Sequence, residues 1–169
     1  MKQAPASLPS ATPRQSPPPL IPLSRRRRAL EGLGVPLAGA IDGQTLSLTL
    51  PVPPSINHHY ATVNGRRVLS AAGRTFKAAV AQQVMVTLAR AGRQAGWRAA
   101  VADRDLTLTI RFFFTSPLRR DVDGGLKITQ DALCEALGLN DNCIVEIHLF
   151  KERDAANPRM EVSLRALSH

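Results

Sequence analysis

The sequence is poor in the residues that define several classes of protein. It has only two cysteines, Cys134 and Cys143, in 169 residues, too few for a disulfide scaffold. A structural zinc site needs more cysteine or histidine ligands at suitable spacing, so we expect two free thiols. No run approaches the ~18 uncharged apolar residues of a membrane span. No apolar segment follows the N-terminal basic residues as it would in a secretory signal, and we expect a cytoplasmic protein.

Acidic residues are also scarce. There are 13 Asp and Glu against 22 Lys and Arg, which gives a net charge of +9 and a pI near 11.0. A balance this basic favours polyanionic partners such as nucleic acid. The length is close to the ~150 residues of one domain, so we expect a single core.

Residues 1–43 differ in composition from the rest of the chain. Eight of the thirteen prolines fall between Pro5 and Pro36. Such a segment has too little apolar surface to offset the entropy of ordering, and we expect a disordered tail before a domain at 44–169. The run Arg25–Arg28 is either a non-specific DNA-binding arm or a solvated charge cluster.

The domain begins with strand patterns. Residues 45–50 alternate with period two, and the prolines that follow end the strand. Residues 60–63 and 66–69 flank Asn64-Gly65, a strong signal for a β-hairpin. Residues 106–114 form a longer strand, and further strands are predicted at 144–151 and 160–167.

Two helices are predicted between these strands. Ser70 is a suitable N-cap for a helix over residues 71–95, and a second helix over 123–137 ends at Gly138 and Asn140. The first has an apolar stripe made by Phe76, Val80, Val84 and Leu88. Helices and strands interleave, so we predict the mixed α/β (α+β) class with a single mixed sheet packed against helices.

Acidic residues gather around the second predicted helix. Asp121 and Asp123 precede it, Asp131 lies within it and Asp141 follows it, with Lys127 among them. A carboxylate cluster binds Mg²⁺, which can activate water and neutralise charge on a phosphodiester. The same residues also fit ordinary structural roles, because acids are favoured at helix N-termini and Lys127 and Asp131 have the spacing of a surface ion pair.

A proline-rich loop offers further polar groups. His58 and His59 lie in it, after Pro53-Pro54. Taken alone, we expect both histidines to be exposed loop residues rather than metal ligands.

Three segments together resemble one known family. Residues 53–60 (P-P-S-I-N-H-H-Y) resemble the opening P-P-S-x-N-x-x-Y motif of the RusA-type Holliday junction resolvases. Residues 119–133 resemble the family's R-R-D-x-D-N-x-x-K-x-x-x-D-A-L block, and residues 140–146 resemble its closing D-D-x-x-V motif. The motifs occur in order over residues 44–167.

The resemblance implies a homodimeric, Mg²⁺-dependent endonuclease that nicks four-way DNA junctions symmetrically. Asp121, Asp123 and Asp141 fall on the family's metal-binding aspartates, and Lys127 falls on its catalytic lysine. The basic and polar residues that we expect to contact branched DNA are Arg119, Arg120, Asn57, Tyr60, Arg66, Arg67, Arg74 and Lys77.

Two positions depart from the family pattern. Gly124 stands where the family usually has Asn, and Asn140 replaces the first acid of the closing pair. We therefore keep open the alternative of a non-catalytic branched-DNA-binding protein with the same fold. The resemblance also leaves open whether the role is that of a prophage or a chromosomal protein.

Overall fold

The computed structural model describes residues 38–55, 59–92, 94–116 and 120–167. The predicted N-terminal tail up to residue 37, including Arg25–Arg28, lies outside the described residues.

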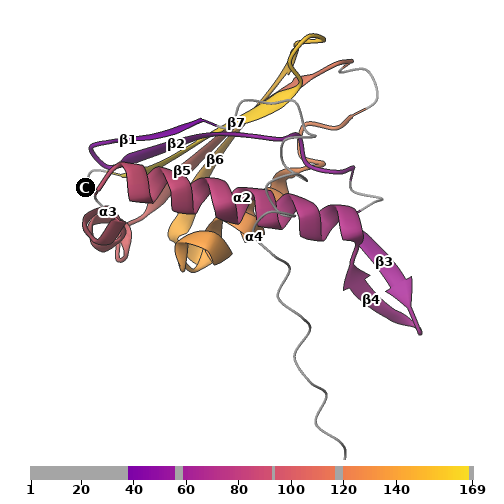
Figure 1. The fold of residues 1–169 in the computed structure, drawn as a ribbon, viewed down its shortest axis with the longest axis horizontal. Helices are drawn as coiled ribbons and strands as arrows, with labels where there is room; N and C mark the ends of the chain where they lie inside the picture. The colour runs from indigo at the N-terminus through magenta and orange to yellow at the C-terminus, as the bar shows by residue number, and fades with distance from the viewer. Residues whose placement is uncertain (1–37, 56–58, 93, 117–119, 168–169) are drawn as a thin grey trace, which may run out of the picture.

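A five-stranded sheet forms one layer of the fold. In spatial order its strands are β1 (Gly39–Asp42), β2 (Thr45–Leu50), β7 (Arg159–Ala166), β5 (Leu106–Phe114) and β6 (Ile144–Arg153) (Figure 1). β5 and β6 run parallel, whereas the other neighbouring pairs run antiparallel. The sheet is therefore mixed, as the sequence predicts.

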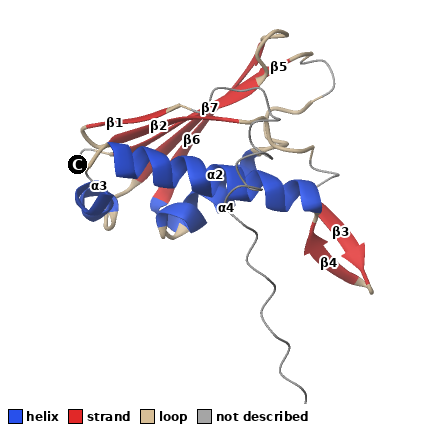
Figure 2. Ribbon diagram, viewed as in Figure 1, coloured by secondary structure: helices blue, strands red, loops and turns tan. Residues whose placement is uncertain are grey.

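Helices form the second layer, on one side of the sheet. They are α2 (Ala71–Arg90), α3 (Gln94–Val101) and α4 (Leu126–Leu137), drawn in blue in Figure 2. α4 is the crossover between the parallel strands β5 and β6, which explains how those strands run in the same direction. A short 3-10 turn, η3 (Asp141–Cys143), joins α4 to β6.

The core lies between these two layers. The predicted stripe of α2 is buried and packs with alternate residues of β2, β5 and β7. The largest fully buried side chains include Leu46, Leu50, Val80, Leu88, Leu106, Leu108, Ile110, Phe112, Met160 and Leu164. Among the described residues no helix covers the opposite face of the sheet, where the alternate residues Thr45, Ser47 and Thr49 of β2 are more accessible than their neighbours.

The structure corrects three predicted boundaries. The long helix stops at Arg90, and Gly92 adopts a φ of 58° before α3 begins. α4 begins at Leu126 instead of Asp123, because a turn precedes it. Residues 39–42, predicted to belong to the tail, form β1 and pair with β2. Four residues are too few to show a periodic pattern by themselves.

A separate hairpin projects from the N-terminal end of α2 (Figure 1). It consists of β3 (Tyr60–Val63) and β4 (Arg66–Leu69), as predicted. Asn64 and Gly65 make the turn with φ values of 50° and 72°, the left-handed conformations that a tight hairpin turn requires.

No described helix is long and apolar enough to cross a membrane.

The N-cap of α2 can be tested by substitution. The side-chain oxygen of Ser70 accepts a hydrogen bond from the Gly73 N–H at 3.0 Å, and no acidic residue lies in the first turn. We expect Ser70→Ala to lower the free energy of unfolding by about 1 kcal/mol, because an N–H loses its partner. Ser70→Asp, which restores an acceptor, is the control. Urea unfolding of both variants measures the difference, and equal losses would contradict the capping role.

Candidate active site

The acidic segment before α4 is held in tight turns. The Gly124 N–H donates to the Asp121 carbonyl at 3.3 Å, and the Leu126 N–H donates to the Asp123 carbonyl at 2.9 Å. Asp121 and Asp123 are exposed, so both are accessible to a ligand from solvent. This turn delays the start of the helix.

Gly125 fixes where this segment meets the core. A Cβ atom at Gly125 would lie 2.4 Å from Cγ of Pro53 and 3.2 Å from the Phe112 ring. Only glycine therefore fits at this close approach. Gly124 differs, because a Cβ there would meet only the Asp121 carbonyl at 3.3 Å.

Lys127 lies between two carboxylates. Its ammonium is 2.8 Å from Asp131 Oδ1 and 3.3 Å from Asp141 Oδ2. The hydrogen bond to Asp131, and to a smaller extent the hydrogen bond to Asp141, raises the pKa of Lys127 above its ordinary value. The lysine is 67% exposed and remains a cation at neutral pH. Asp131 was predicted either to join the acidic cluster or to form a surface ion pair with Lys127, and the structure shows the ion pair at the i,i+4 spacing.

The loop after α4 positions Asp141. Gly138 ends the helix with a φ of 68°, and the Asn140 side chain accepts from the Asn142 N–H at 3.2 Å. Asn140, one of the two departures from the family pattern, thus caps the turn that carries Asp141. An open hollow of about 620 Å³ lies here, lined by residues that include Asp131, Glu135 and Asp141.

The chemistry of these side chains fits a hard divalent cation, which prefers oxygen ligands. Among the described residues, however, no three Asp, Glu, His or Cys side chains gather closely enough to hold a metal ion. The carboxylates of the predicted metal set are exposed, and Asp141 contacts Lys127.

The proline-rich loop is tied to the acidic segment. Arg120 Nη1 donates to the Pro53 carbonyl at 3.2 Å, and its guanidinium lies 5.2 Å from the centre of the Phe114 ring. Lys151 Nζ in turn donates to the Arg120 carbonyl at 2.8 Å. Arg120, predicted to contact DNA, therefore also joins two parts of the site.

His59 corrects one expectation. It is 3% exposed rather than accessible, and its Nε2 donates to the Pro54 carbonyl at 2.7 Å. His59 anchors the loop, because its ring N–H finds its hydrogen-bond acceptor inside the protein. His58 lies outside the described residues.

The predicted DNA-contacting residues have different surroundings. Arg66 is exposed, and Tyr60 is 38% exposed. Arg74 Nη1 donates to the Leu69 carbonyl at 2.6 Å, and Lys77 forms an ion pair with Glu135. Arg119, Asn57 and the side chain of Arg67 lie outside the described residues.

The charge along the sequence is strongly uneven around these positions. Residues 43–102 contain no Asp or Glu. The same stretch contains seven basic residues: Arg66, Arg67, Arg74, Lys77, Arg90, Arg93 and Arg98. The hairpin and α2 therefore carry positive charge without compensating acids of their own, which favours binding of a phosphate backbone.

The two cysteines are free, as predicted. Cys134 is buried, and burial raises the pKa of its thiol to about 11. Burial also raises the pKa of Cys143. Thiolates are the reactive and metal-binding form, so the shift disfavours both roles at neutral pH.

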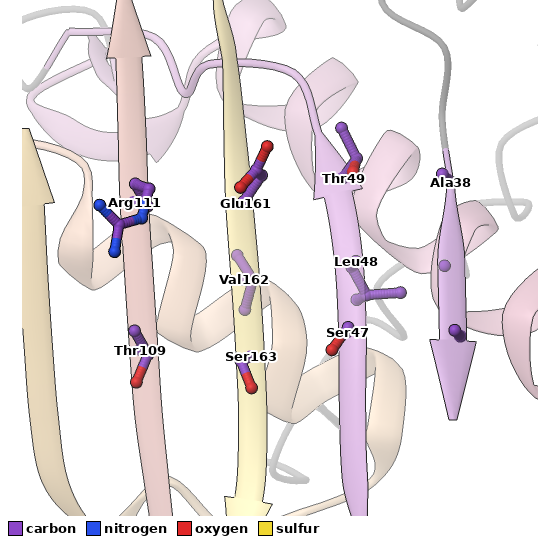
Figure 3. A pocket seen from close by; sticks show the side chains of 11 residues that line it. Ala38, Ser47, Leu48, Thr49, Thr109, Arg111, Glu161, Val162 and Ser163 are labelled. Atoms are coloured by element: carbon purple, nitrogen blue, oxygen red, sulfur yellow. The ribbon is translucent and has the colours of Figure 1, made fainter. Parts of the chain in front are cut away.

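A second hollow, of about 420 Å³, lies on the helix-free face of the sheet (Figure 3). Ser47, Thr49, Thr109, Ser163, Arg111 and Glu161 are among the residues that line it. It contains none of the predicted catalytic residues, so the acidic segment and its surroundings remain the candidate site.

Comparison with known proteins bears on this site. The family model described as endodeoxyribonuclease RusA matches residues 51–165. The chain belongs to the RusA endodeoxyribonuclease family. The match includes every residue assigned above to the acidic segment, the proline-rich loop and the hairpin. Membership makes the protein a DNA endonuclease, as predicted.

Curated RusA relatives are similar over nearly their whole length. The crossover junction endodeoxyribonuclease RusA of Escherichia coli O139:H28 is 27% identical over 128 residues, which cover 73% of this chain and 96% of the relative. The protein of the same name from strain K12 is 27% identical over 130 residues, covering 74% and 98%. A structure titled putative MotB like protein from Desulfovibrio vulgaris aligns with 12% identity over 87% of this chain and 94% of that one. Its TM-score of 0.33 is too low to show a shared fold.

The close packing at Gly125 predicts a loss of stability. We expect Gly125→Ala to lower the free energy of unfolding by about 1–3 kcal/mol, because the new methyl group overlaps Pro53 and crowds Phe112. Gly124→Ala is the matched control, with a much smaller effect. Thermal unfolding compares the two, and equal melting temperatures would refute the packing argument.

The surroundings of Lys127 predict an ordered change in its pKa. We expect Asp131→Asn to lower the pKa of Lys127, and Asp141→Asn to lower it less, because the hydrogen bond to Asp131 is the larger cause. The pH at which the Lys127 ammonium loses its proton then moves to lower values. NMR titration of the lysine side chain measures both shifts. An unchanged pKa in both variants would show that neither carboxylate holds the ammonium in solution.

Proposed function

We propose that this endonuclease resolves four-way DNA junctions, using Mg²⁺ and acting as a homodimer. The observation that carries the proposal is the match to the RusA family together with its three motifs in order. The similar curated relatives are named crossover junction endodeoxyribonucleases. The acid-free stretch from residue 43 to residue 102 supports binding of the phosphate backbone.

In the proposed mechanism, Asp121, Asp123 and Asp141 would hold the metal by moving together around it, since the described side chains do not form a cluster of three ligands by themselves. A divalent cation bound there would supply charge neutralisation at the scissile phosphate and an activated water. Asp121 and Asp123 are exposed on the turns before α4, where a DNA strand has access to them.

Lys127 has a separate role in the proposal. Hydrolysis adds water across one P–O bond, and negative charge develops on the phosphoryl oxygens and on the leaving oxygen. The raised pKa of Lys127 keeps its ammonium protonated, so it acts as a positive charge that stabilises the transition state rather than as a base. Asp131 and Asp141 orient that ammonium through the contacts described above.

The proposed homodimer matches the symmetry of the substrate. A dimer with two-fold symmetry presents two equivalent active sites to a junction with two-fold symmetry, which gives paired symmetric nicks. Both strands would therefore be cut within one complex of the dimer with the junction.

Cleavage of a labelled synthetic junction tests the proposal. We expect paired nicks in a four-way junction with Mg²⁺, and none with a chelator or in a linear duplex of the same sequence. Asp123→Asn should reduce the rate by about 100-fold or more, because it removes a charged ligand from the proposed metal site. Denaturing electrophoresis of both labelled strands measures the nicks.

The controls separate cleavage from binding. Asp123→Asn should still bind the junction, which a gel-shift assay measures. Tight binding by the unaltered protein without nicking in any divalent metal would support a binding-only protein. Equal cutting of junction and duplex would refute selectivity for branched DNA.

A further inference from the structure

The β3–β4 hairpin carries an exposed apolar face. In its antiparallel register Ala61 lies opposite Val68, and Val63 lies opposite Arg66, so these four residues share one face. Val63 is 52% exposed and Val68 is 39% exposed. We refer to Ala61, Val63, Arg66 and Val68 as the valine face. No described residue outside the hairpin covers its two valines enough to bury them.

The hairpin is held firmly at its base. The Ser70 N–H donates to the His59 carbonyl at 2.9 Å, and Arg74 donates to the Leu69 carbonyl. The backbone at Gly73 approaches so closely that a Cβ there would lie 2.9 Å from the His59 carbonyl. An isolated two-stranded hairpin is marginally stable in water, so these contacts are what hold the projecting arm in place.

The positive charge around the valine face favours a polyanionic partner. The hairpin lies in the stretch of residues 43–102 that has no acidic residue, and Arg66 belongs to the valine face itself. The same face of a second copy would bring like charges together, whereas a polyanion is complementary. The observations therefore favour DNA over a second copy of the chain.

The valines restrict which part of DNA can be bound. The phosphate groups offer nothing apolar. In a continuous duplex the large apolar faces of the bases are stacked on each other, and only sugar carbons and thymine methyl groups remain accessible in the grooves. At a branch point the bases can be unstacked at lower cost, and apolar side chains can then contact their faces. We propose that the valine face inserts among the bases at the centre of a branched DNA, with Arg66 on an adjacent phosphate. This inference rests on the proposed function and identifies the residues that would make the enzyme selective for branched DNA.

The proposal also explains how the branch point is related to the cut. His59 at the base of the hairpin binds the Pro54 carbonyl, and Arg120 beside the acidic segment binds the Pro53 carbonyl. Two adjacent residues thus connect the arm to the catalytic segment. An arm seated at the branch point holds the acidic segment at a set position along the DNA strand.

Fluorescence and binding together test the insertion. The full-length chain with Asp123→Asn, which blocks cleavage, is compared with the same chain that also carries Val63→Thr and Val68→Thr. Threonine keeps the branched shape and the strand preference of valine but adds a hydroxyl group. The probe is a four-way junction with 2-aminopurine beside the branch point, and the reference is a linear duplex.

We expect the valine variant to lose about tenfold in its preference for the junction over the duplex, with duplex affinity unchanged within about twofold. The rise in 2-aminopurine fluorescence on binding should also be lost. Ile147→Thr is the matched control, since Ile147 is also 39% exposed but lies on β6. Arg66→Gln should instead weaken binding to both DNAs. It should also reduce the slope of log affinity against log salt concentration by about one.

Other outcomes overturn the inference in distinct ways. An unchanged junction preference, or an equal loss on junction and duplex, would show that the valines do not recognise the branch. A change in sedimentation of the valine variant without DNA would identify the face as a contact between copies. If the junction preference depends on the valines but the unaltered protein never cuts, the proposed function fails and this inference stands.

Discussion

The carbonyl oxygens of Pro53 and Pro54 are the constraint on which the site depends. One accepts from Arg120 and the other from His59, so the acidic segment and the hairpin are both tied to the same two residues. Proline has no N–H and a fixed φ, and a Pro-Pro pair therefore presents its carbonyls from a stiff backbone. Gly125 completes the arrangement, because only a residue without a side chain lets the turn before α4 pack against the Pro53 ring.

Charge is distributed unequally over the same region. The acids that contact Lys127 come from α4 and from the turn before β6, both C-terminal to β5. The hairpin and α2 contribute basic residues and no acids. A phosphate backbone can thus be attracted by one part of the chain while the carboxylates that repel it are concentrated in another. Lys127 reduces that repulsion locally, because its ammonium lies between two of the carboxylates.

Much of the fold could be predicted from local patterns. The alternation in residues 45–50 and 106–114, the Asn64-Gly65 turn and the Ser70 cap each reflect interactions within a few residues, and the structure confirms them. The exceptions depend on contacts between distant segments. β1 is too short to show a pattern and is defined by its pairing with β2. α4 starts only after the turns that follow Asp121, at the point where Gly125 lies against Pro53.

The candidate site was less predictable for the same reason. Spacing indicated the pair Lys127–Asp131, but the burial of His59 and the attachment of Arg120 to Pro53 depend on side chains that meet only in the folded chain. The metal-binding roles of Asp121, Asp123 and Asp141 remain predictions from the family motifs.

The position of β7 has a consequence for how the enzyme is made. β7 follows every other described strand in the sequence, yet it lies in the middle of the sheet, bonded to β2 on one side and β5 on the other. During synthesis the N-terminal and C-terminal parts of the sheet cannot join until this segment has left the ribosome. Contacts of such long sequence separation also slow folding. A chain that has not yet formed β7 therefore lacks the assembled sheet that supports the acidic segment.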